Sequence, residues 1–180
     1  MPVETTANHA TLRAFFALWP DEPVHAALAP LVRDIARQAH GRTTAVQSVH
    51  LTLAFLGEVP AAALPALEAI GASMACGRFE MRLAQCGAFA RARVAWVAPV
   101  EIPPELTLLE SELRTALAAA GFRTEARPFT PHMTLARRCT RPLPPFAIVP
   151  IVWRVDRLSL MASSLEPGGA RYRELAAWAL

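Results

Sequence analysis

The sequence predicts an α+β fold, on three observations. Apolar runs of strand length alternate along the chain with longer segments of helical spacing. Two strand candidates, 78–89 and 93–98, are joined by a short connection, which favours an antiparallel hairpin. A His-x-Thr phrase occurs in a strand-like run in each half of the chain, each time after a helical segment. We therefore expect a bilobal fold: two mostly antiparallel sheets, with helices outside, around a central cleft.

The first half of the chain is expected to begin with a buried strand in the apolar run 11–20. Asp21 then caps a helix that extends to about Gln38, with Pro23 in its first turn. Pro30 should kink or divide this helix, because proline lacks the amide hydrogen that a helix interior uses. The further elements of this half are a loop or weak strand at 40–48, a strand at 49–56 and an Ala- and Leu-rich helix at 61–75.

The second half is expected to continue from the hairpin into a helix that starts at Pro103 and Pro104 and is capped by Gly121. The elements after it are the second His-x-Thr strand at 131–138, a proline-rich loop at 141–146, one half-exposed strand at 151–163, and a last strand or short helix after a turn at 168–169.

Composition favours one domain and excludes several classes of protein. Residues 1–10 are polar and are expected to form a disordered leader, with 11–180 as a single bilobal domain. No run of about 18 apolar residues is present, so we expect no membrane span. The three cysteines lack a Cys-x-x-Cys spacing, which argues against disulfides and a thiolate zinc site and favours the cytoplasm. The formal charge is +3, with arginine as the basic residue, and it suits an anionic ligand.

The two His-x-Thr phrases are the strongest candidates for a functional site. Side chains alternate along a strand, so His50 and Thr52 share one face, and His132 and Thr134 repeat that arrangement. If both strands line one cleft, two imidazoles and two hydroxyls converge. That set suits phosphodiester chemistry, because one neutral histidine accepts a proton from water while a protonated one donates to the leaving oxygen. Threonine hydroxyls can hold phosphate oxygens, and an arginine would offset the growing negative charge.

Two structural alternatives compete with this interpretation. A single His-x-Thr on a strand is more often a surface or core-edge histidine beside a β-favouring threonine. The repetition, with matching apolar flanks, favours a site. A metal centre is disfavoured, because His9, His25 and His40 fall in the leader, a helix and a loop, and no carboxylate stands at ligand spacing from either motif.

The chain resembles the two-histidine (2H) phosphoesterases, in particular the bacterial RNA 2',3'-cyclic phosphodiesterases, also described as 2'-5' RNA ligases. The resemblance lies in the stretches RAFFALWP, HLTLAFLGEV, RARVAWV, RPFTPHMTLARR and WRVDRLSLMASSLEPGGARYRELAAWAL. It implies one motif on each lobe and neither a metal nor another cofactor. It also implies hydrolysis of 2',3'-cyclic phosphate, on RNA 3' ends or nucleotides, to a 2'-phosphomonoester. Some members also join tRNA halves reversibly through a 2'-5' linkage. We expect a monomer.

The resemblance also assigns roles by motif position. His50 would be the acid that protonates the 3' leaving oxygen, and His132 the base that activates water. Thr52 and Thr134 would hold the phosphate, and Arg137 would assist there.

At the position five residues beyond each histidine, simple side-chain alternation and a role in the site lead to different predictions. Alternation turns Arg137 away from the cleft and Arg138 toward it, unless the strand twists or bulges after Leu135; the resemblance favours Arg137. In the first motif the equivalent residue is Phe55, for which alternation predicts the core and the functional alternative is stacking beneath a nucleobase. Arg171 and Tyr172, near the last turn, could touch a ligand, but such residues are more often at a strand edge, and we leave them outside the site.

The sequence leaves two other functions open. The cleft could hold an RNA end without catalysis, as a binding module whose affinity falls with salt. Alternatively, the same chemistry could act on another cyclic or 2'-5' phosphodiester.

Overall fold

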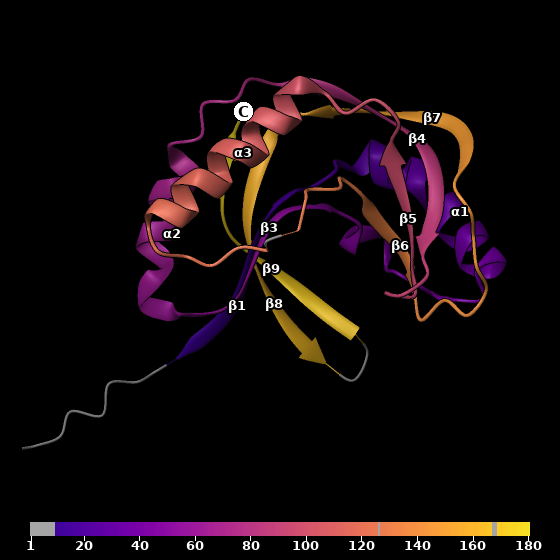
Figure 1. Cartoon of the computed structure of the whole chain (residues 1–180), viewed down its shortest axis with the longest axis horizontal. Coiled ribbons are helices and arrows are strands. Elements are labelled where there is room, and N and C mark those ends of the chain that lie inside the picture. The colour runs from indigo at the N-terminus through magenta and orange to yellow at the C-terminus, as the bar shows by residue number, and fades with distance from the viewer. Residues whose placement is uncertain (1–9, 126, 167–168) are drawn as a thin grey trace, which may run out of the picture.

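The computed structural model describes residues 10–125, 127–166 and 169–180, which form nine strands and three α-helices (Figure 1). The α+β class is confirmed. Residues 1–9 of the expected leader 1–10 lie outside the described residues, and the carbonyl of Ala10 accepts a hydrogen bond from the Ala61 N–H at 2.8 Å. In chain order the elements are β1 (Thr11–Leu18), α1 (Glu22–Gln38), β2 (Arg42–Thr43), β3 (Leu51–Pro60), α2 (Leu64–Ala72), β4 (Phe79–Phe89), β5 (Val94–Pro99), α3 (Pro104–Ala119), β6 (Met133–Arg137), β7 (Phe146–Val155), β8 (Arg157–Glu166) and β9 (Gly169–Ala179), with 3₁₀ turns at Val46–Ser48 and Ala61–Ala63.

The strands form one antiparallel sheet, so the prediction of two separate sheets is wrong. Their order is β7-β4-β5-β6-β3-β1-β8-β9, and β2 pairs with β6. The halves join where β3 meets β6, through the single residue pair Leu51 and Met133. By contrast, β1 pairs with β3 along its whole length. The two motif strands therefore lie side by side at the centre of the sheet.

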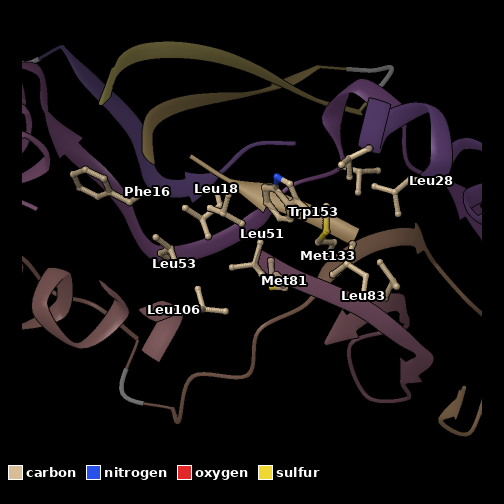
Figure 2. Packing of buried hydrophobic residues seen from close by; sticks show 14 of the residues in the cluster. Phe16, Leu18, Leu28, Leu51, Leu53, Met81, Leu83, Leu106, Met133 and Trp153 are labelled. Atoms are coloured by element: carbon tan, nitrogen blue, oxygen red, sulfur yellow. The ribbon is translucent and has the colours of Figure 1, made fainter. Parts of the chain in front are cut away.

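The helices tie the two halves of the sheet together. Helix α1 follows β1 but packs on β6 and β7, whereas α3 follows β5 but packs on β3 and α2. Figure 1 shows α1 at one side of the molecule and α2 and α3 at the other. One core cluster draws buried residues from both halves, as Figure 2 shows for Leu18 and Leu51 beside Met81 and Trp153. Burying this shared apolar surface stabilises both halves as one unit.

Helix α1 begins as expected but is not divided. Asp21 is the N-cap, and its carboxylate accepts a hydrogen bond from the Val24 N–H at 3.2 Å. Pro30 lies inside a continuous helix and is exposed, so its ring meets solvent. The missing amide costs one hydrogen bond, while Leu28 and Val32 on either side of it are buried in the core.

The predicted strand at 151–163 is two strands, β7 and β8, separated by Asp156 alone. β7 pairs with β4, whereas β8 pairs with β1 and β9. A single residue separates the two strands, so the alternating pattern gives no sign that the chain changes pairing partners there. Residue 168 of the expected turn at 168–169 lies outside the described residues, and the segment that follows it is a strand, β9, and not a helix.

Cys76, Cys86 and Cys139 are all free and buried. In the part of the chain that the structure describes, no helix is long and apolar enough to cross a membrane.

Candidate active site

The two motif histidines have the same local geometry. Each stands immediately before a strand, His50 before β3 and His132 before β6. The Nδ1–H of His50 donates to the Ser48 carbonyl at 2.7 Å, and that of His132 donates to the Thr130 carbonyl at 2.8 Å. A carbonyl oxygen only accepts, so Nδ1 carries the hydrogen in both rings. Nε2 of each ring is therefore left to accept or donate a proton.

The junction between β3 and β6 brings the two motifs onto one face. Because Leu51 lies opposite Met133 in an antiparallel pair, His50 is placed opposite Thr134 and Thr52 opposite His132. All four side chains line one pocket, together with Thr44, Ser48, Arg137 and Tyr172. The pocket therefore combines two imidazoles with hydroxyls and one guanidinium.

Both motif strands carry a bulge directly after the threonine. The pairing of β1 with β3 steps from Ala54 to Thr52 and passes over Leu53. The pairing of β5 with β6 steps from Ala136 to Thr134 and passes over Leu135. An extra residue in a strand reverses the alternation beyond it. The fifth residue after each histidine, Phe55 in β3 and Arg137 in β6, therefore lies on the same face of its strand as that histidine.

The bulge at Leu135 determines which of two neighbouring arginines, Arg137 or Arg138, faces the pocket. Arg137 lines the pocket. Arg138 follows with φ 57°, in the left-handed region, and is not among the lining residues. The structure therefore places Arg137 at the site, as the resemblance favoured.

Phe55 is not in the main core, so the prediction from alternation is wrong. The bulge at Leu53 turns it to the site face, where it is half-buried in a small cluster with Phe15. The guanidinium carbon of Arg13 lies 4.8 Å from the centre of the Phe55 ring. Phe55 does not itself line the pocket.

Three aromatic rings surround His50. Trp19 is stacked on the imidazole, with centroids 4.7 Å apart and planes at 9°. Tyr172 meets it edge-on at 5.0 Å, and Phe15 is tilted against it at 5.1 Å. This burial, more than the positive charge of Arg137, lowers the pKa of His50 to about 4. His50 is thus neutral in the ligand-free protein near pH 7.

The surroundings of His132 differ from those of His50. One aromatic ring, Phe89, meets it edge-on at 5.0 Å. The two histidines thus share their backbone anchoring but not their environment.

The sequence interpretation missed three residues that line the pocket. Tyr172, which the sequence interpretation left outside the site, comes from the edge strand β9, lines the pocket and meets His50. Its one signal was that it is the single tyrosine of the chain. Thr44 and Ser48 lie in a segment interpreted as a loop or weak strand, and no motif marks them.

No metal centre is formed by the described residues. Among them, no three or more His, Cys, Asp or Glu side chains lie close enough together to hold a metal ion.

A model of the 2'-5' RNA ligase superfamily matches residues 20–166. The chain belongs to this superfamily. It is 38% identical over 144 residues to the RNA 2',3'-cyclic phosphodiesterase of Escherichia coli strain K12. The aligned region covers 78% of this chain and 80% of that relative. It is 31% identical over 179 residues to the protein of the same name from Thermus thermophilus, covering 94% and 90% of the two chains.

Solved structures of E. coli LigT have the same fold as this chain. E. coli LigT complexed with 3'-AMP superposes with a TM-score of 0.86 at 32% identity, over 95% of this chain and 99% of that one. The apo form of E. coli LigT gives a TM-score of 0.84. The family that the sequence resembles, in both motifs and in the stretches around them, is confirmed.

Proposed function

We propose that the protein hydrolyses the terminal 2',3'-cyclic phosphate of RNA or of a nucleotide to a 2'-phosphomonoester, without a metal. The observation that carries the proposal is the convergence of two identically anchored imidazoles, His50 and His132, on one pocket with two motif threonines and Arg137. Relatives at 31–38% identity are RNA 2',3'-cyclic phosphodiesterases, which supports this substrate. A solved relative in complex with 3'-AMP supports a nucleotide end as the group recognised.

The chemistry needs one proton acceptor and one proton donor. Water attacks phosphorus as one imidazole Nε2 takes its proton, and the bond from phosphorus to the 3' oxygen breaks. The other imidazole donates a proton to that oxygen, which leaves a 2'-phosphate and a free 3'-hydroxyl. Thr52 and Thr134 donate hydrogen bonds to the non-bridging oxygens, and Arg137 offsets the charge that builds there.

The resemblance makes His50 the acid and His132 the base. In the ligand-free protein His50 is neutral, because burial lowers its pKa to about 4. A phosphodiester anion beside Nε2 favours the protonated imidazole and raises that pKa. We therefore propose that His50 takes up its proton as the substrate binds.

The same site also supports 2'-5' joining of RNA. A 5'-hydroxyl that replaces water as the nucleophile would give a 2'-5' phosphodiester in place of a 2'-phosphate. This step uses the same two proton transfers and needs no ATP, so tRNA halves that end in a cyclic phosphate are proposed substrates.

The test is to incubate the pure protein with a nucleoside 2',3'-cyclic phosphate in the presence of EDTA. The wild type should form the 2'-phosphate, and His50→Ala and His132→Ala should each lose at least about 100-fold in turnover while remaining folded by circular dichroism. Thr43→Ala, an exposed residue that does not line the pocket, is the control and should keep wild-type activity.

Four outcomes would contradict the proposal. Full activity in either histidine variant contradicts the proposed acid–base roles of His50 and His132. Activity that needs added metal indicates a metallohydrolase. A 3'-phosphate product reverses the regiochemistry. Salt-sensitive binding without any product supports the non-catalytic RNA-end module.

A further inference from the structure

Thr44 lines the pocket of the two motifs but belongs to neither of them. It follows β2, and its N–H donates to the Leu135 carbonyl at 2.9 Å, which fixes its backbone to the bulge of β6. Its hydroxyl oxygen is buried and has no hydrogen-bond partner within the described residues. A buried hydroxyl without a partner costs free energy, so the position is explained if a ligand supplies the missing acceptor.

Strand pairing places the Thr44 side chain on the pocket side. Arg42 lies opposite Arg137, and Thr43 lies opposite Ala136. Residues directly opposite in an antiparallel pair share a face, and side chains alternate along a strand. Thr44 therefore shares the face of Arg137, whereas Thr43 is turned away and is exposed.

The other groups at the pocket define the ligand chemistry. Arg137 can only donate hydrogen bonds, and the hydroxyls of Thr52 and Thr134 can donate as well. Such a set suits an anion whose oxygens carry no hydrogen. We infer that Thr44 donates a third hydroxyl hydrogen bond to a non-bridging oxygen of the bound phosphate, an inference that rests on the proposed function of the same site.

The inference predicts opposite effects on stability and on binding. Thr44→Val keeps the shape of the side chain and removes the hydroxyl. The ligand-free variant should be more stable than the wild type, because a buried unpartnered group is gone. Phosphate affinity should fall about tenfold, because a hydrogen bond to a charged group is lost. A threonine with a purely structural role would lower stability when replaced.

The experiment measures inorganic phosphate binding by calorimetry and the thermal midpoint for the full chain. Thr44→Val should raise the midpoint and weaken phosphate binding about tenfold. Thr44→Ser, which restores the hydroxyl, should bind within about twofold of wild type. The matched control is Thr43→Val, which should leave phosphate affinity unchanged.

Three results would overturn the inference: phosphate affinity unchanged in Thr44→Val, a lowered midpoint in that variant, or no phosphate binding by the wild type. Binding needs no turnover, so the proposed function is judged separately. A wild type that binds phosphate but leaves a 2',3'-cyclic nucleotide intact contradicts the proposed activity alone. Turnover with an unchanged Thr44→Val affinity contradicts the role of Thr44 alone.

Discussion

Replacing His50 by glutamine should change how the stability of the protein depends on pH. Trp19, Tyr172 and Phe15 bury the imidazole, and its pKa falls from 6.5 to about 4. Between these two values the unfolded chain binds more protons at this group than the folded chain does. Stability contributed by the group is therefore lost as the pH falls from about 6.5 toward 4. Linkage gives a loss of about 2 kcal/mol in the free energy of unfolding between pH 7 and pH 5.

The assay is urea unfolding followed by tryptophan fluorescence, at pH 7 and at pH 5. The free energy of unfolding of the wild type, minus that of His50→Gln, should fall by about 2 kcal/mol between these pH values. Thr52→Val, a neighbouring change without a titrating group, should show a difference that does not depend on pH. If the His50→Gln difference stays constant, burial does not lower this pKa. If it rises at pH 5, the aromatic rings stabilise the charged imidazole and the reasoning is refuted.

Two further predictions test the bulge at the site and the packing of the sheet. Arg137→Met should reduce kcat/KM for a 2',3'-cyclic nucleotide by about 100-fold, whereas Arg138→Met should stay within about threefold; equal losses would show that the bulge does not select the arginine. Gly71→Ala should destabilise the chain by about 1–3 kcal/mol in urea unfolding, because a Cβ would lie 2.3 Å from the Trp178 ring. Gly77→Ala, with nothing within 4 Å, should change stability far less, and a stabilised Gly71→Ala would disprove this packing.

Much of the fold was predictable because its elements are encoded locally. Asp21 and Pro23 mark the start of α1, and the short connection between β4 and β5 predicts their hairpin, as observed. The pattern could not show that Asp156 separates two strands with different partners. It also could not show that a single pair, Leu51 and Met133, joins the halves into one sheet. Both depend on contacts between segments that are distant in sequence.

In the candidate site, too, some residues were predictable from local sequence and others depend on contacts between strands. The His-x-Thr spacing identified His50 and His132, because a strand puts every second residue on one face. The fifth position stayed ambiguous, since a bulge appears only in the pairing with a neighbouring strand. Arg137 reaches the pocket through that bulge. Tyr172 arrives from β9, and no local pattern connects it to either motif.

By itself the sequence determined the family, and its two histidines and two threonines in repeated strand-like phrases indicated the chemistry that is proposed for it. The tertiary structure alone decided which further residues share their pocket. It placed Arg137 by a bulge, Tyr172 by the order of strands, and Thr44 by the pairing of β2 with β6. The physical reason is that side-chain alternation is a property of one strand, whereas register, bulges and neighbours are set by hydrogen bonds between strands.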